Sequence, residues 1–268
     1  MNPEKSIAII LGSAFEGSFA ERLQLKEEKV ETEFGDITLY RSNLRNDRPA
    51  YVIFRHGLPH SMLPNQINYR AQAAALKKVN CGVLLINSSV GVMDAELPLY
   101  QPMLVTDLLM PENRLPDGST CTMFPEPSED HGHLLIKDGL FSSTLNTLLI
   151  SQHKEEIYQA EEGVVFVYAG GPRGKTPAEN RMWAQLGGQV NSMTLAPEVV
   201  LANELEIPTS ALVVGHKYSV PDVENPKQEE IGATLENARS ATEKILYSFL
   251  IEGNPVEYQN EMYRFKDE

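Results

Sequence analysis

Hydroxyl side chains, an arginine and several glycines follow the short apolar runs of this sequence, and together they could bind a phosphate group. Ser13 comes after the run 7–11, separated from it by Gly12, while Arg55 and His56 directly follow the run 51–54. Backbone N–H groups at a glycine turn, hydroxyl groups and a guanidinium fork are donors suited to an anion. Each turn alone is equally well explained as an ordinary helix cap or as a surface ion pair.

Two further segments repeat the pattern. Ser88 and Ser89 follow the run 83–87 and lead to Gly91, and Thr194 stands just before a helical pattern at 197–205. If all four segments lie at the same edge of one sheet, their donors converge there. The sequence therefore favours a phosphate pocket, built against a strongly acidic background.

The elements that would hold these residues alternate between strand and helix patterns. The predicted strands are short, apolar and rich in β-branched residues: 7–11, 51–54, 83–87, 164–168 and 210–214. The predicted helices are amphipathic: 66–79, 177–186, 197–205 and 228–250. The predicted helix 177–186 has a capping box at its start, made by Thr176 and Glu179, with Pro177 at the first helical position. This alternation predicts an α/β fold with a central mixed, mainly parallel sheet flanked by helices, and ligands beyond the carboxyl ends of its strands.

The remaining segments show weaker patterns. The stretch 111–139 contains four prolines and little periodicity, which predicts a long loop. Because no repeat or linker is visible, a single domain over 1–268 is the simplest division, with the tail after about 252 only partly ordered.

Composition narrows the function classes. The 268 residues are 42% hydrophobic and 22% charged, with a net charge of −14, and the isoelectric point is about 4.9. Such a charge disfavours nucleic acid and anionic membranes as partners. Cys81 and Cys121 lack the spacing of a metal site, so no metal is expected. No run reaches the roughly 20 apolar residues of a membrane span, and none fits a signal peptide, so a cytoplasmic protein is expected.

Two long blocks carry a family resemblance. They are RHGLPHSMLPNQINYRAQAAALKKVNCGVLLINSSVG at 55–91 and VYAGGPRGKTPAENRMWAQLGGQVNSMTLAPEVVLANE at 167–204. With IAIILGSAF at the start, they resemble the methylthioadenosine phosphorylase branch of the purine nucleoside phosphorylases. The resemblance implies the nucleoside phosphorylase fold, a homotrimer, and attack of inorganic phosphate on the anomeric carbon of a nucleoside. It implies no cofactor, since phosphate is a co-substrate.

The resemblance also implies roles for individual residues. Its phosphate-binding positions correspond here to Ser13, Arg55, His56, Ser88, Ser89 and Thr194. Met193 matches a methionine that packs under the ribose, and His133, with His131 nearby, matches a histidine that a neighbouring subunit adds to the sugar pocket. Ile231 and Leu235 fall where a pocket for the 5′ substituent is expected, although apolar helix positions are usually core.

The base-binding positions differ from the family pattern. His216 stands where the family has Asp or Asn, and Tyr218 stands where adenine-specific members have a second Asp. Gly174 replaces a phenylalanine that packs on the base, and Lys175 replaces an acid or serine. We expect His216 and Lys175 to be the catalytic groups at the base, with a protonated His216 acting as a general acid. Lys175 would favour an anionic or carbonyl-rich ring.

The sequence is compatible with two functions. The first is a pentosyltransferase that cleaves a purine-type nucleoside, such as methylthioadenosine or methylthioinosine, into a pentose 1-phosphate and a free base, with altered base specificity. The second is a catalytically impaired relative that binds a nucleoside, phosphate or a protein partner. His216 distinguishes them, because only the enzyme should need it.

Overall fold

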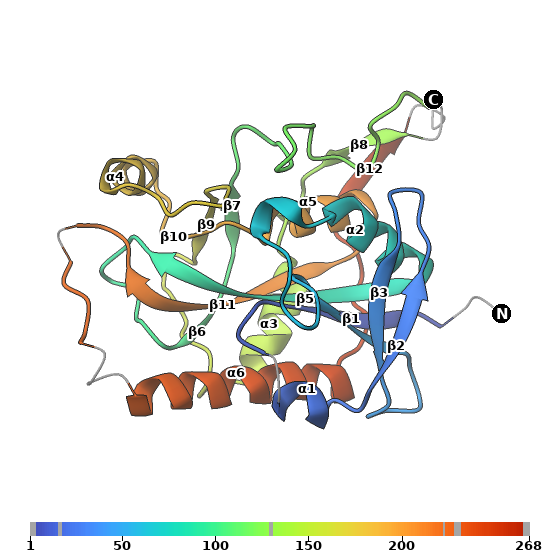
Figure 1. Cartoon of the computed structure of the whole chain (residues 1–268), viewed down its shortest axis with the longest axis horizontal. Helices are drawn as coiled ribbons and strands as arrows, with labels where there is room; N and C mark the ends of the chain where they lie inside the picture. The colour runs from blue at the N-terminus through green and yellow to red at the C-terminus, as the bar shows by residue number, and fades with distance from the viewer. Residues whose placement is uncertain (1–3, 16–17, 129–130, 222, 228–231, 265–268) are drawn as a thin grey trace.

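A ten-stranded mixed sheet forms the centre of the protein (Figure 1). The computed structural model describes residues 4–15, 18–128, 131–221, 223–227 and 232–264. The strands of this sheet are β1 (Ser6–Leu11), β2 (Leu25–Val30), β3 (Ile37–Ser42), β4 (Ala50–Phe54), β5 (Cys81–Val92), β6 (Pro102–Leu104), β7 (Asp107–Leu109), β9 (Val165–Tyr168), β10 (Val190–Ser192) and β11 (Thr209–Tyr218). Their order is β2-β3-β4-β1-β5-β10-β9-β7, and β11 lies between β5 and β6.

The central strands β4, β1, β5 and β11 are parallel. Every residue of β1 and β4 is buried, which is why these strands are continuous apolar runs. The edge hairpin β2–β3 and the short β6 are antiparallel to their neighbours. The predicted mixed, mainly parallel sheet is confirmed.

Helices cover both faces of the sheet. They are α1 (Ser18–Arg22), α2 (Tyr69–Lys78), α3 (Ser143–Gln152), α4 (Pro177–Gln185), α5 (Ala196–Glu204) and α6 (Gly232–Glu252), with one 3-10 turn, η1 (Pro64–Gln66). Figure 1 shows α2 and α5 on one side of the central strands and α1 and α6 on the other. Alternate residues of β1 enter the two cores accordingly: Ile7 and Ile9 pack with α6, and Ala8 and Ile10 lie in the core shared with α2 and α5.

Two strands extend further than their apolar runs predicted. β5 continues through Ser88 and Gly91 to Val92, because β11 pairs with it along this length and β10 pairs with its last two residues. β11 likewise continues to Tyr218, with a register shift between Gly215 and Lys217 that leaves His216 as the extra residue of a bulge. The serines at 88 and 89 therefore lie within a strand, not in a turn after it.

The predicted start of α4 is confirmed. The Thr176 hydroxyl accepts from the Glu179 N–H, and the Glu179 carboxylate accepts from the Thr176 N–H. This capping box satisfies two N–H groups that lack a partner inside the helix.

The segment 111–139 was predicted to be a loop and the chain after Glu252 to be only partly ordered, but each contributes one strand to a second sheet. This sheet joins β8 (Gly132–Leu135) to β12 (Glu261–Arg264) as an antiparallel pair. Both strands are short and half exposed, and their partners are far apart in sequence. Neither strand therefore has the local apolar pattern by which buried strands are recognised.

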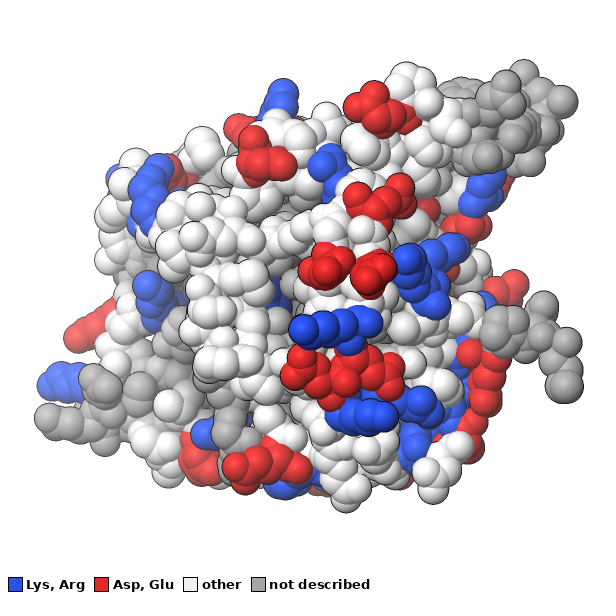
Figure 2. All heavy atoms as spheres, turned by 45° about the vertical axis from the view of Figure 1, so that its right-hand side comes forward, with Lys and Arg blue, Asp and Glu red and all other residues white. Residues whose placement is uncertain are grey.

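The surface mixes both signs of charge on the face drawn in Figure 2, where basic and acidic residues lie side by side beside an uncharged area. The excess of acid thus does not form a single patch on this face. No helix among the described residues is long and apolar enough to cross a membrane.

His153, at the end of α3, makes stability depend on pH. The residue is 4% exposed, and neither ring nitrogen has a hydrogen-bond partner among the described residues. Burial lowers the pKa of His153 from its ordinary 6.5; Glu156 and Glu252 oppose this effect and Lys244 adds to it. The unfolded chain therefore binds the proton more tightly, and this contribution to stability is lost as pH falls through the unfolded pKa.

We accordingly expect the free energy of unfolding to decrease between about pH 7.5 and pH 5.5, and to decrease less steeply in His153→Gln. Urea unfolding of both proteins at several pH values measures the difference. Identical pH slopes for the two proteins would contradict this assignment.

Candidate functional site

A cavity of about 480 Å³ lies beyond the carboxyl ends of the parallel strands. Residues that follow or end β1, β4, β5, β9 and β11 all line it, which is the place where open α/β sheets bind ligands. Nine of the residues predicted from the sequence line this one cavity: Ser13, Arg55, His56, Ser88, Ser89, Lys175, Met193, Thr194 and His216.

Arg55 is held rigidly at the end of β4. It is 1% exposed, and its Nε and Nη2 donate to the two carboxylate oxygens of Glu198 at 2.5 and 2.7 Å. Nη2 also donates to the Asn87 carbonyl at 3.1 Å. This bidentate geometry fixes the plane of the guanidinium and leaves Nη1 for a ligand.

Gly12 provides the room for that free nitrogen. A Cβ placed on Gly12 would lie 3.2 Å from Arg55 Nη1, and both residues line the cavity. The glycine after β1 therefore allows close approach of the guanidinium, a role that its place in a turn alone did not reveal.

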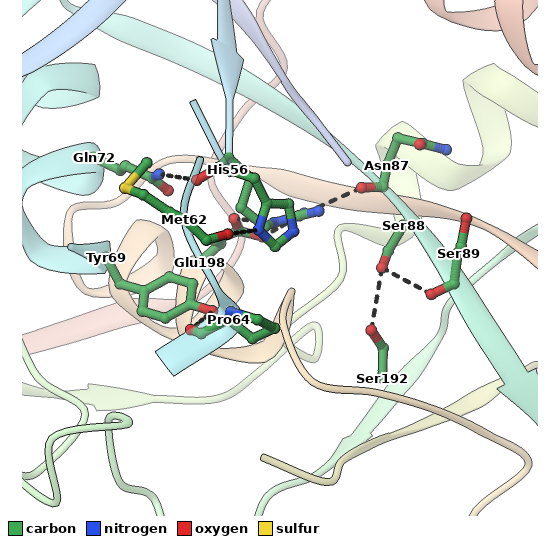
Figure 3. Close-up of polar contacts among 11 residues, drawn as sticks. His56, Met62, Pro64, Tyr69, Gln72, Asn87, Ser88, Ser89, Ser192 and Glu198 are labelled. Carbon is green, nitrogen blue, oxygen red and sulfur yellow. Dashed lines mark hydrogen bonds and ion pairs between the residues drawn. The ribbon is translucent and has the colours of Figure 1, made fainter. Parts of the chain in front are cut away.

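The hydroxyl groups come from three other elements. Figure 3 shows Ser88 of β5 with its hydroxyl near the Ser89 carbonyl and the Ser192 hydroxyl, at 3.2 and 3.4 Å. These contacts are long, so the Ser88 hydroxyl can turn toward a ligand. Ser13, in the turn after β1, also lines the cavity.

Thr194 reaches the cavity through a strained turn before α5. Leu195 has φ 74° and ψ −54°, and the Ala196 N–H donates to the Thr194 carbonyl at 2.9 Å. This is a γ-turn of the rare positive-φ kind, which costs about 1–3 kcal/mol. The full burial of Leu195 in the core holds the turn in place.

Two histidines stand at the same end of the cavity. The rings of His56 and His60 are stacked, with centroids 4.6 Å apart. His56 Nδ1 lies 2.8 Å from the Met62 carbonyl, so Nδ1 carries the proton (Figure 3). Desolvation lowers the pKa of His56, this hydrogen bond opposes it, and Arg55 and His60 lower it further. The neutral ring then presents Nε2 as an acceptor.

The positions that the sequence predicts for the base, called the base end, carry basic and polar side chains. Lys175 Nζ donates to the Gly170 and Arg173 carbonyls at 2.7 and 3.3 Å. Consecutive strand residues normally point to opposite faces of a sheet. His216 and Lys217 nevertheless both line the cavity. The bulge at His216 explains this, because it interrupts the alternation of side chains along β11.

The pKa shifts at this end are all downward. Desolvation, followed by Arg173, lowers the pKa of Lys175 from 10.5. Desolvation and Lys217 lower the pKa of His216 below 6.5, against a hydrogen bond to the Val214 backbone. The structure thus favours a neutral His216 near pH 7, where the sequence led us to expect a protonated general acid.

Two predicted residues do not line this cavity in the single chain, and a third lies outside the described residues. His133 lies in β8, its ring 5.2 Å from that of Tyr263, and does not line the cavity. Leu235 lies in α6, 48% exposed, and does not line it either. Ile231 is outside the described residues. Their roles remain predictions.

Sequence reasoning missed the groups that hold the site together. Glu198 lies within the predicted helix 197–205, where it had no assigned role, yet it is the partner of Arg55. Asn180 donates to the Ser219 carbonyl at 2.8 Å and accepts from Asn191 at 3.1 Å, and this chain of amides links α4, β10 and the end of β11. An arginine expected at a buried strand end could have prompted a search for a carboxylate partner.

No three His, Cys, Asp or Glu side chains lie together in the arrangement of a metal site in the part of the chain that the structure describes. The cavity lining includes guanidinium, ammonium and hydroxyl groups, which are donors suited to an anion.

Comparisons with known proteins found relatives of this chain by sequence and by fold. The family model described as the phosphorylase superfamily matches residues 6–251. A probable S-methyl-5′-thioinosine phosphorylase of Methanopyrus kandleri is 32% identical over 80% of this chain and 78% of its own length. An S-methyl-5′-thioadenosine phosphorylase of Aedes aegypti is 30% identical over 81% and 77%. Methylthioadenosine phosphorylase from Schistosoma mansoni, solved with adenine, has the same fold, with a TM-score of 0.73 at 22% identity over 91% and 89% of the two chains.

Proposed function

The chain belongs to the phosphorylase superfamily, and from this premise we propose that it is a nucleoside phosphorylase that cleaves a purine-type nucleoside with inorganic phosphate. The products are a pentose 1-phosphate and the free base. The observation that carries the proposal is the phosphate end of the cavity, where Arg55 is fixed by Glu198 with Nη1 left free, beside the hydroxyls of Ser88 and Thr194.

The reaction follows from this arrangement. A phosphate oxygen forms a bond to the anomeric carbon while the bond from that carbon to the base nitrogen breaks, and its electron pair leaves with the base. Positive charge develops on the sugar in the transition state, and the bound phosphate, held by fixed donors, stabilises it. Ser13 and Ser89 complete the phosphate site as donors, His56 accepts through Nε2 from the O–H of hydrogen phosphate, and Met193 packs against the ribose.

The base end supports a leaving group that gains electron density. Lys175 and His216 both line the cavity, and the Lys175 ammonium donates to the Gly170 carbonyl. A neutral His216 can still donate its N–H to a ring nitrogen, which assists departure without full proton transfer. Methylthioadenosine and methylthioinosine are the first substrates to test, as the names of two relatives suggest.

The assembly and location rest on the resemblance. We propose a cytoplasmic homotrimer in which His133 of a neighbouring copy closes the sugar pocket, with Leu235 and Ile231 near the 5′ substituent. Phosphate is the co-substrate and no other cofactor is required.

The test is a panel of purine nucleosides incubated with and without phosphate. We expect base release and pentose 1-phosphate only when phosphate is present, and a rate about 10²-fold lower in His216→Ala. Chromatography of the products measures both. Lys26→Ala, on the exposed face of β2, is the matched control and should leave the rate unchanged.

A negative panel would favour the second function. If pure wild-type protein cleaves no purine nucleoside but binds phosphate, the chain is a binding protein built on the same fold.

A further inference from the structure

Positive charge is concentrated in the cavity of a strongly acidic chain. The net charge is −14, yet no Asp or Glu is among the described residues that line the cavity. The lining instead includes these basic or titratable groups: Arg55, His56, His60, Lys175, His216 and Lys217. The charged side chains that line the cavity are therefore basic, whereas the protein as a whole carries a net negative charge.

Among the described residues that line the cavity, the charge without an ion-pair partner belongs to the lysines of the base end and not to Arg55. The Arg55 guanidinium is neutralised by the buried Glu198 carboxylate. Within the described ranges, Lys175 and Lys217 have no ion-pair partner within 4 Å. The acid nearest in sequence to Lys175, Glu179, is held by both Nη groups of Arg173 at 2.9 and 2.7 Å.

Lys175 is positioned as an anion ligand. Two of its three N–H bonds point to the Gly170 and Arg173 carbonyls, so the third is available to the cavity. Gly174 beside it also lines the cavity, and a Cβ placed there would meet no atom within 4 Å. The space beside the ammonium is therefore not filled by other protein atoms.

The rest of the cavity lining has apolar residues (Leu63, Pro64, Ala169 and Met193) and polar ones, but no Phe, Tyr or Trp among the described residues. Asn180, Asn191 and Ser219 line it from α4, β10 and the end of β11. A ring bound here is recognised by polar contacts along its edge, and ring carbonyls are the groups that suit ammonium donors.

Resting on the proposed phosphorolysis, we propose that the base end accepts a leaving group that departs as an anion, namely a purine with two ring carbonyls. The electron pair of the broken carbon–nitrogen bond spreads into the ring and onto the carbonyl oxygens. Lys175 and Lys217 stabilise that charge, so the cleavage step itself requires no proton transfer. The exocyclic amine of an aminopurine would instead place N–H donors against ammonium groups, which selects against it.

The experiment compares kcat/KM for 2,6-dioxopurine, 6-oxopurine and 6-aminopurine ribosides in the presence of phosphate. We expect the dioxopurine riboside to be the best substrate of the wild type. Lys175→Met should lower its kcat/KM about 10²-fold and change that of the aminopurine riboside by less than about threefold. Lys175→Arg should retain the order of preference, and Lys26→Met, on exposed β2, should match the wild type.

Calorimetric binding of the free bases separates this inference from the proposed function. Tighter binding of the dioxopurine than of adenine, lost in Lys175→Met, would support the anion site even if no nucleoside is cleaved, an outcome that overturns phosphorolysis alone. Fastest cleavage of the aminopurine riboside, with Lys175→Met unaffected, would overturn the anion site and leave phosphorolysis standing. Thermal unfolding of each variant verifies that it is folded.

Discussion

Glu198→Ala will lower the free energy of unfolding by about 3–5 kcal/mol and abolish most phosphate-dependent activity. The substitution leaves the Arg55 guanidinium buried, 1% exposed, without the carboxylate that accepts from its Nε and Nη2. A buried charge without its partner is among the most destabilising changes in a protein core. Without the bidentate contact, Nη1 also loses its fixed position beside Gly12. Urea unfolding and phosphate-dependent base release measure the two effects.

A double variant separates stability from catalysis. Arg55→Met with Glu198→Leu removes both charges and keeps similar volume, so much of the lost stability should return, whereas activity should not. If Glu198→Ala is as stable as the wild type, the pair does not hold the site. If the double variant remains active, Arg55 does not bind phosphate.

Ser88→Ala with Thr194→Val will lower kcat/KM for phosphate by about 10³-fold and leave stability nearly unchanged. In the proposed site each hydroxyl donates to a phosphate oxygen, and loss of one such donor typically costs about 10²–10³-fold. The Ser88 hydroxyl makes only the contacts at 3.2 and 3.4 Å, and valine keeps the shape of Thr194. Initial rates at varied phosphate, with the nucleoside saturating, give the effect.

Ser151→Ala is the control, because its hydroxyl donates to the Leu148 carbonyl on the exposed side of α3. It should leave the phosphate dependence unchanged. An unaltered KM and kcat for phosphate in the Ser88/Thr194 variant would place phosphate elsewhere.

The parts of the fold that the sequence predicted well are those with continuous apolar runs. β1, β4 and β9 begin and end within a residue of the predicted bounds, because strands buried on both faces need apolar residues throughout. Where pairing continues past the apolar run, as in β5 and β11, the bounds depend on the neighbouring strand. The neighbouring strand is distant in the sequence, so the local residue pattern does not reveal it.

The strands at the edges of the sheets lack the continuous apolar runs by which the central strands were predicted. β2 reads Leu-Lys-Glu-Glu-Lys-Val, a charged edge strand that discourages pairing with other molecules but does not resemble a core strand. The β8–β12 pair joins residues more than 120 positions apart. Such contacts arise from the finished fold.

In the candidate site, too, residues with a local sequence signal were predictable and residues that depend on distant contacts were not. Residues at strand ends, such as Ser13 and Arg55, were predictable because the topology of a parallel sheet brings those ends together. Glu198 was not, because its importance comes from a contact 143 positions away in the sequence. The lowered pKa of His216 likewise depends on desolvation inside the finished cavity.

The bulge at His216 means that chain length, as well as residue identity, controls what the cavity presents. Removing one residue there would restore strict alternation, turning one of the two neighbours His216 and Lys217 out of the cavity while every contact at the Arg55 end stays in place. A homologue could therefore acquire a different leaving group through a single-codon deletion without altering its phosphate chemistry. Alignments that score only substitutions would overlook this route to a new specificity.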